Sequence, residues 1–307
     1  MDGGGSRYHC KCVLTAMGVA LRAKHQQAVR WLGPASTPSH LEERVDIGRL
    51  RISPLVDGTT LHSPVDLYET TTAADWAPHE DLLQPDGKLE VTIGGFLVQG
   101  IPDRTVIIDT GYGVDHDGFG NLTKSLAQSG VRAEEVTDVV LTHLHNDHVG
   151  GISERGALTF PNATVRCHAA DWSWFYRPDV PGKGRPPEHK LAMLLDRLEP
   201  WDRDCAVFPG LNVLSVPGHT PGSSVVVVSS GDKRAFLLGD VVHCPAQLRE
   251  PEWEGLGDVD PLLATAARVA LLRELEDGAT PVTGGHFPGL KFGRLLTSED
   301  GNHSFAT

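Results

Sequence analysis

The stretch THLHNDHVGG at residues 142–151 follows the apolar run VTDVVL and carries three histidines and one aspartate within six positions. So many polar groups are unsuited to a hydrophobic core, which leaves two interpretations: a solvated histidine-rich turn, or half of a metal site. Imidazole nitrogens and carboxylate oxygens are ligands that zinc and similar divalent ions bind. The close order favours the metal site. Within it, His143 and His145 can share one ion, while Asp147 and His148 can face a second.

A half-site needs partners from elsewhere in the chain, and three later segments offer them. His219 lies in VPGHTPGS (216–223), Asp240 in FLLGDVVH (236–243) and His286 in VTGGHFPG (282–289). Each follows a predicted strand and has glycine or proline beside it. Because functional residues are often carried by loops at the ends of rigid elements, we expect these three to join the first four. His243, three residues past Asp240, is expected to be an ordinary surface histidine.

Taken in order, HLHNDH, GHT, GD and GH resemble the metallo-β-lactamase superfamily, over roughly residues 45–293. The resemblance implies an α/β fold built as a four-layer αββα sandwich. It implies that one ion is bound by His143, His145 and His219. It also implies a second ion at Asp147, His148 and His286, with Asp240 bridging the two. Asp109, in IIDTG, matches the strand-end aspartate that orients a ligand histidine in this family.

The chemistry that this site implies is hydrolysis. Two divalent ions that share a water lower its pKa and present it as a bridging hydroxide, and they polarise the substrate. Zinc is the favoured ion, with manganese, cobalt or iron as alternatives. Asp147 and Asp240 are the predicted catalytic residues, with Asp147 placed to take or return a proton. No serine or cysteine nucleophile is required.

The substrate class follows from the branch that the chain resembles. Asp240, together with HFPG and GLKFGRL after the last ligand, is similar to the group of N-acyl-homoserine lactonases, methyl-parathion-hydrolase-like enzymes and arylesterases. We therefore expect a small ester or lactone, with a phosphotriester as a variant. Phe287 stands where the lactonases often have an aspartate. A β-lactam hydrolase is the alternative, although many β-lactamases lack the bridging aspartate. A thioesterase is disfavoured because only residues 287–307 follow His286.

Composition narrows the partners. The 307-residue chain has a formal net charge of −13 and no long run of lysine or arginine, which argues against nucleic acid and a nuclease activity. No apolar run reaches the length that spans a bilayer. The five cysteines are odd in number and lack framework spacing, which favours a cytoplasmic protein. The expected partner is a small-molecule substrate, and a homodimer is left open.

The chain divides near Val45. Residues 1–44 are read as an N-terminal extension, partly flexible by composition, and residues 45–307 as the catalytic domain. In the latter, helices are expected at 122–129, 188–198 and 261–277. The last is expected to have Leu262, Leu263, Ala266, Val269 and Ala270 on its apolar face, followed by Leu272 and Leu275. Strands are expected at 89–98, 105–111, 136–143, 164–169, 211–216, 223–229, 234–240 and, as a final short one, 280–285.

One aromatic segment has two interpretations. DWSWFYRPD (171–179) places Trp172, Trp174, Phe175 and Tyr176 in a row. They can form an apolar wall of the substrate pocket, with Tyr176 donating a hydrogen bond to the leaving oxygen. The favoured alternative is a helix that packs these aromatic side chains into the domain.

Overall fold

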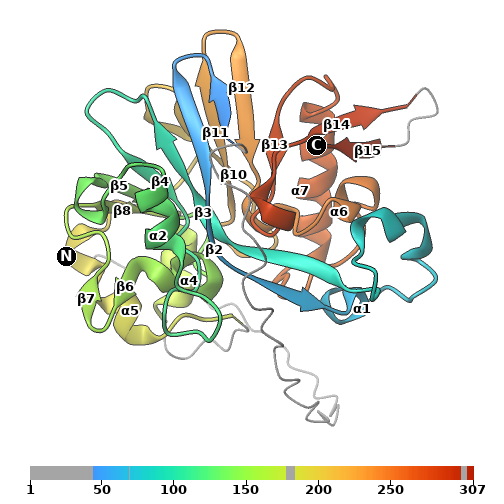
Figure 1. The fold of residues 1–307 in the computed structure, drawn as a ribbon, viewed down its shortest axis with the longest axis horizontal. Coiled ribbons are helices and arrows are strands. Elements are labelled where there is room, and N and C mark those ends of the chain that lie inside the picture. Colours follow the sequence, from blue (N-terminus) through green and yellow to red (C-terminus); the bar gives the residue numbers. More distant parts are fainter. Residues whose placement is uncertain (1–43, 69, 178–183, 299–302) are drawn as a thin grey trace, which may run out of the picture.

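A computed structural model describes residues 44–68, 70–177, 184–298 and 303–307. Two β-sheets pack face to face, and helices cover the outer face of each (Figure 1). The extension at residues 1–44 lies outside the described residues, apart from Arg44. Among the helices that are described, none is both long and apolar enough to cross a bilayer.

The first sheet has six strands in the order β1-β2-β3-β4-β5-β8. The strands from β1 to β4 pair antiparallel, whereas β4, β5 and β8 are parallel. Their bounds are β1 Val45–Ile47, β2 Leu50–His62, β3 Leu89–Gln99, β4 Val106–Ile108, β5 Asp138–Val140 and β8 Thr164–Arg166.

The second sheet has five strands in the order β13-β12-β11-β10-β9. All neighbours are antiparallel except β12 and β13, which are parallel. Two small hairpins, β6–β7 and β14–β15, stand apart. The bounds are β6 Ser153–Glu154, β7 Ala157–Leu158, β9 Cys205–Phe208, β10 Leu211–Ser215, β11 Ser224–Ser230, β12 Lys233–Leu237, β13 Val282–Thr283, β14 Arg294–Thr297 and β15 His303–Ala306.

Three apolar layers hold the sandwich together. Between the sheets, Ile52 and Val98 of the first meet Val226 and Leu237 of the second. On the outer face of the first sheet lie helices α2, α4 and α5, and on that of the second lie α6 and α7. This arrangement is the predicted αββα sandwich.

The helices are α1 Pro64–Leu67, α2 Leu122–Gln128, α3 Asn146–Val149, α4 Ala169–Phe175, α5 Glu188–Ala192, α6 Ala246–Arg249 and α7 Pro261–Glu274. The 3-10 helices are η2 Ala77–Leu82, η3 Ala133–Glu135, η4 Gly150–Ile152, η5 Leu195–Arg197, η6 Gly239–Val241 and η7 Pro288–Leu290.

Helix α7 begins where it was predicted, but it buries a different face from the predicted one. Asp260 caps it by accepting a hydrogen bond from the Leu263 backbone N–H at 3.0 Å. The first part of the predicted apolar face is wrong: Leu262 is 84% exposed, and the buried residues of the helix are Ala264, Arg268, Leu271 and Leu272. Leu272 and Leu275, at the end of the predicted face, are buried as expected. The helix turns this way because the Arg268 side chain is buried by polar contacts that periodicity does not reveal.

Two other predictions change at the level of elements. The helix expected at 188–198 divides into α5 and η5. The strand at 280–285 forms as β13, but it is not the last, because β14 and β15 follow it. Elsewhere the predicted strands form, in several places as shorter segments; β5, for instance, spans only Asp138–Val140.

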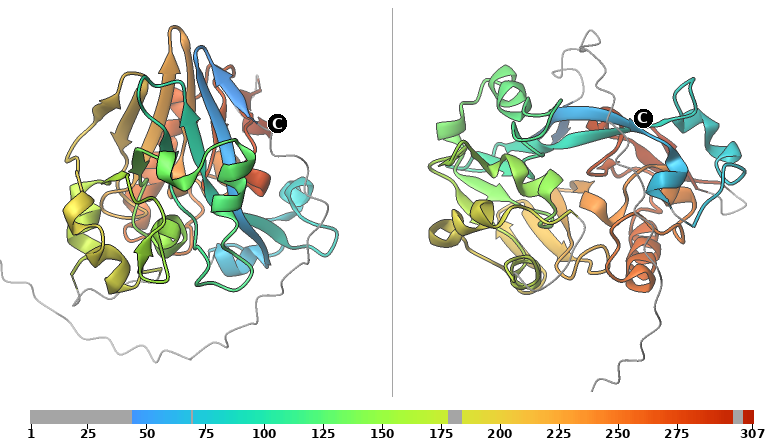
Figure 2. Two further views of the ribbon diagram at one scale, coloured as in Figure 1. Left: turned by 60° about the vertical axis from the view of Figure 1, so that its left-hand side comes forward. Right: turned by 90° about the horizontal axis from the view of Figure 1, so that it is seen from below.

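The first sheet also extends beyond the second. Strands β2 and β3 stay paired as far as His62 and Leu89, and they carry the segment between them, with α1 and η2, away from the sandwich (Figure 2). Tyr68, Trp76 and Trp253 pack their rings together there, with centroids 4.9–6.0 Å apart. This projecting end of β2 and β3, together with α1, faces a cavity at the edge of the two sheets.

Candidate metal centre

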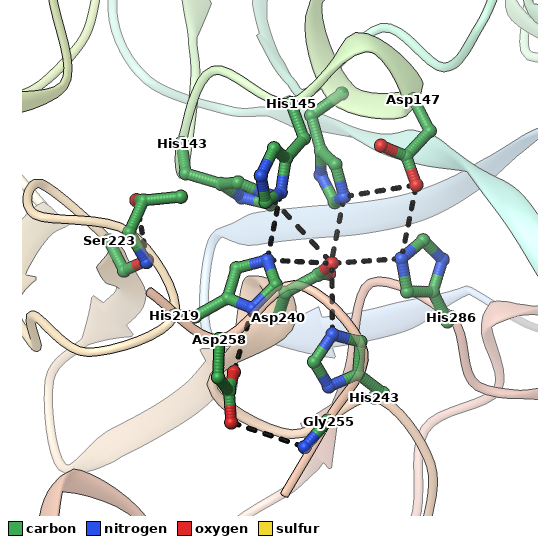
Figure 3. Close-up of polar contacts among 12 residues, drawn as sticks. His143, His145, Asp147, His219, Ser223, Asp240, His243, Gly255, Asp258 and His286 are labelled. Atoms are coloured by element: carbon green, nitrogen blue, oxygen red, sulfur yellow. Dashed lines mark hydrogen bonds and ion pairs between the residues drawn. The ribbon is translucent and has the colours of Figure 1, made fainter. Parts of the chain in front are cut away.

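The loops after β5, β10, β12 and β13 bring the predicted polar residues together at one edge of the sandwich (Figure 3). Two groups form, and Asp240 belongs to both. Within each group, the atoms that could bind a metal lie within 4.8 Å of one another. The first group is His143, His145, His219 and Asp240; the second is Asp147, His148, Asp240 and His286.

The local backbone explains why so many polar side chains face inward. After β5 the chain passes through His143 and His145 and turns into the short helix α3, which begins at Asn146 and places Asp147 and His148 on its first turn. Gly151 allows its own backbone to approach the loop that follows β4, because a Cβ at Gly151 would lie 2.1 Å from the Thr110 carbonyl oxygen. The glycine pair of HVGG is therefore needed for this close approach.

The far nitrogen of four histidines is held by a hydrogen-bond acceptor. His148 Nδ1 lies 2.9 Å from Asp109 Oδ2, and His219 Nδ1 lies 2.9 Å from Asp258 Oδ1. His286 Nδ1 lies 3.4 Å from a backbone carbonyl. His143 Nδ1 faces the Thr142 hydroxyl, which already donates its proton to Asp109. Each Nδ1 therefore carries the proton, and each Nε2 presents a lone pair to the centre of the site.

The nitrogen and oxygen atoms around these lone pairs are themselves mostly acceptors; His286 Nε2, for example, lies 2.9 Å from Asp240 Oδ2. His143 Nε2 and His219 Nε2 lie 3.0 and 2.9 Å from the same atom, His145 Nδ1. His148 Nε2 and Asp240 Oδ1 are buried 3.2 Å apart, and neither has a hydrogen-bond partner. Acceptors packed against acceptors repel each other unless positive charge lies between them. The residues present therefore fit a pair of divalent cations.

The pKa values point to the same requirement. Burial lowers the pKa of His145 to about 3. Burial alone would raise the pKa of Asp240, but His148 and His286 hold it well below its usual range. Burial alone would lower the pKa of His148, yet the negative charges of Asp240 and Asp109 keep it well above its ordinary value, so that a second proton, on Nε2, competes with a metal ion for this position. An ionised carboxylate at the centre thus demands positive charge beside it.

The site opens into a cavity of about 290 Å³. Leu89, Val91 and Ile93 alternate along β3 and present one face to it, and Leu67 continues that surface; these four residues are called the apolar wall. Tyr112 and Leu256 also line the cavity. Within the part of the chain that the structure describes, no lysine or arginine does.

The aromatic row 172–176 does not line this cavity. Trp172 and Trp174 pack against the core of the first sheet, Phe175 is buried in it, and Tyr176 stacks on Trp172 at 5.0 Å. The pocket-wall hypothesis for these four residues is therefore wrong, and the alternative, a helix packed into the domain, is what α4 forms. The Phe175 ring of α4 nevertheless packs against a residue of the site, since its centroid lies 5.3 Å from that of the His145 ring.

His243 is a second correction. Instead of lying on the surface it lines the cavity, with Nε2 3.5 Å from Asp240 Oδ2 and its ring stacked at 5.8 Å on that of His286. Its spacing from Asp240 was the only signal in the sequence.

Two further aspartates with buried side chains, Asp171 and Asp258, belong to no motif that the sequence analysis could have recognised. Asp171 accepts hydrogen bonds from the backbone of Leu144 and from Thr220, and so joins the loops of His143 and His219.

Comparison with known proteins agrees with this geometry. Residues 95–286 match the family described as the Metallo-beta-lactamase superfamily. A probable metallo-hydrolase of Mycobacterium tuberculosis, Rv2300c, is 25% identical over 172 residues, which cover 46% of this chain and 54% of that protein. The chain thus spans about half the length of this curated relative.

Two further proteins cover more of the chain. Metallo-beta-lactamase domain-containing protein 1 of Xenopus laevis is 29% identical over 228 residues, 73% of this chain and 81% of that protein. A solved structure of AidC, described as a dizinc quorum-quenching lactonase in complex with a product, superposes with a TM-score of 0.76 at 25% identity. That match covers 85% of this chain and 95% of AidC.

Proposed function

Because the chain belongs to the metallo-β-lactamase superfamily, we propose that it is a metal-dependent hydrolase of small, neutral esters or lactones. The observation that carries the proposal is the pair of four-residue groups that share Asp240 and open into a cavity. Structural zinc sites are normally single and closed, whereas a catalytic site keeps a position open to substrate. The similarity to AidC, a lactonase, supports the substrate class.

In this proposal two divalent ions, zinc by preference, are held by the two groups. The first is held by His143, His145 and His219, the second by Asp147, His148 and His286, and Asp240 contributes to both. When bound, such a pair activates a water and polarises the carbonyl oxygen of the substrate. The carbonyl carbon is then the point of attack, and the alkoxy oxygen leaves.

The chain's own residues handle the proton and the orientation of the substrate. Asp147 lines the cavity, with Oδ2 3.4 Å from His286 Nε2 and 3.9 Å from His148 Nε2. It is therefore placed to accept a proton from the attacking water and to return it to the leaving oxygen. Asp109 holds His148 in the tautomer that a metal needs.

The cavity indicates what kind of molecule fits. Its apolar wall suits an alkyl or acyl chain, and each buried methylene contributes about 0.8 kcal/mol. An anionic substrate would need a cationic partner, and no described lysine or arginine faces the cavity. A neutral substrate with an apolar chain is therefore the proposed class.

The test is hydrolysis of a panel by the zinc-loaded protein, before and after chelation. The panel holds an acyl-homoserine lactone, an aryl ester, an aryl phosphotriester and a chromogenic β-lactam. We expect turnover of the lactone or the ester, loss of turnover on chelation and return with zinc. Asp240→Ala should lose at least about 10³-fold in kcat, some 4 kcal/mol. Asp232→Ala, which removes an exposed carboxylate from the β11–β12 turn, is the matched control and should retain activity. Preference for the β-lactam, or near-normal turnover by Asp240→Ala, would contradict the proposal.

A further inference from the structure

The segment 251–260, between α6 and α7, is fastened to the loop of His219 by several hydrogen bonds. The backbone N–H of Val259 donates to the His219 carbonyl at 3.1 Å, and that of Asp260 donates to the Gly218 carbonyl at 2.9 Å. From the same segment, the Asp258 side chain reaches His219 Nδ1 at 2.9 Å (Figure 3). His219 is thus held at both its backbone and its ring.

Asp258 is itself held by buried donors. Its side chain is 1% exposed, and its second oxygen, Oδ2, lies 3.2 Å from the Gly255 backbone nitrogen and 3.4 Å from Arg268 Nη1. The Arg268 side chain is 0% exposed, although it belongs to a surface helix. Its other nitrogens donate to the carbonyls of Pro251 and Trp253 and to the Thr265 hydroxyl. Removing either partner of this buried ion pair would leave the charge of the other buried without a counter-charge, which is strongly destabilising.

The same segment also shapes the cavity. Leu256 and Gly257 line it, and a Cβ at Gly257 would lie 3.6 Å from the His219 ring and 3.7 Å from the His145 ring. Arg268 therefore ties the segment to α7, while Asp258 ties it to His219. Neither residue belongs to the two metal-binding groups.

We propose that Asp258, supported by Arg268, is a positioning residue that keeps His219 in its Nδ1–H tautomer and aims His219 Nε2 at the first metal group. The inference rests on the proposed function, since it concerns a ligand of that site. An imidazole can bind a metal through Nε2 only if the proton is on Nδ1. Among the residues that the structure describes, Asp258 supplies the one acceptor that His219 Nδ1 contacts.

Asp258→Asn separates this role from simple packing because the side chain keeps its shape. Gly255 N–H and Arg268 both demand an acceptor, so the amide oxygen should turn toward them and the amide NH₂ toward His219. His219 Nδ1 would then accept a hydrogen bond, and the proton would move to Nε2. Asp258→Ala removes both contacts. Glu252→Gln removes an exposed carboxylate from the same segment and is the matched control.

Two measurements on the full chain test the inference. In the metal-free protein, ¹⁵N–¹H correlation spectra of the His219 ring, assigned with His219→Gln, should report Nδ1–H in the wild type and in Glu252→Gln but Nε2–H in Asp258→Asn. In a zinc titration against a chromophoric chelator, both Asp258 variants should bind one of two ions about 10- to 100-fold more weakly. The affinity for the other ion, and both affinities of Glu252→Gln, should stay at wild-type values.

The outcomes separate the two proposals. An unchanged tautomer in Asp258→Asn, or unchanged zinc affinities in both Asp258 variants, would overturn the positioning role and leave the two-metal proposal standing. Equal weakening of both ions would also overturn it, because that result indicates a general loss of structure. A wild-type protein that takes up no zinc would overturn both proposals.

Discussion

Replacing Asp109 by asparagine is the sharpest perturbation that the site allows. The Asp109 backbone has φ of +58°, a left-handed conformation that asparagine tolerates well. Its carboxylate accepts three hydrogen bonds: Oδ1 from the Thr142 N–H at 2.8 Å, and Oδ2 from the Thr142 hydroxyl at 2.7 Å and from His148 Nδ1 at 2.9 Å. Asparagine has the same shape but offers only one acceptor atom. Whichever way its amide turns, an NH₂ group meets a donor.

The size of the effect follows from those three contacts. At least one charge-assisted hydrogen bond is lost, worth about 1.5–3 kcal/mol. For a domain of this length, that corresponds to a fall in Tm of about 3–5 °C. Because two donors face Oδ2, the amide oxygen should stay toward His148, and a neutral amide then replaces the carboxylate that accepts from Nδ1–H, which makes the ring a weaker metal ligand. We therefore expect affinity for the second ion to fall about 10- to 100-fold.

Asp57→Asn provides the control for stability without the metal. Asp57 is fully buried and also accepts three hydrogen bonds, from the backbone N–H groups of Gly113, Gly120 and Leu122. Thermal unfolding of the metal-free proteins and chelator-competition titrations with zinc should show a similar loss of Tm in both variants. Only Asp109→Asn should lose zinc affinity. Equal zinc affinities in the two variants would refute the role assigned to Asp109.

Further predictions concern the cavity. Among the contacts of the described residues, the Tyr112 hydroxyl has no hydrogen-bond partner, while its ring is held 4.2 Å from His116 and 4.9 Å from Phe119. Tyr112→Phe should therefore lower kcat/KM about 3- to 10-fold through one lost hydrogen bond to substrate, with Tm and zinc content unchanged; an unaltered kcat/KM would show that the hydroxyl does not contact substrate. Val91→Phe should fill part of the apolar wall and shift the preference toward shorter chains, about 4-fold in kcat/KM per displaced methylene, and an unchanged chain-length profile would count against the wall. Trp172→Ala should lower the free energy of unfolding by about 1–3 kcal/mol while kcat/KM stays near wild type, whereas a selective loss of kcat/KM would restore the pocket-wall hypothesis.

The sequence was most informative where a motif and a strand end coincide. His143, His145, Asp147 and His148 follow β5, and His219, Asp240 and His286 follow later strands, so the topology that buries the strands also gathers these residues. Asp109 could be found for the same reason, since it directly follows β4. The four-layer architecture followed from the family resemblance more than from the individual element boundaries.

The errors have a common physical cause. Helix α7 was oriented by apolar periodicity, yet a buried Arg268 and its contacts with Asp258 and two backbone carbonyls decide which face points inward. His243 entered the cavity because the turn after Asp240 directs it there, toward His219 and His286. In each case the deciding contacts are made with residues outside the helix or turn itself, so its own periodicity does not reveal them.

The most direct test of the central claim is the number of zinc ions that the full chain retains after loading and removal of the excess. Elemental analysis against protein concentration should give two equivalents for the wild type, because both groups need a cation between their converging lone pairs. One equivalent would contradict the shared two-metal site, and none would contradict the metal-dependent function altogether.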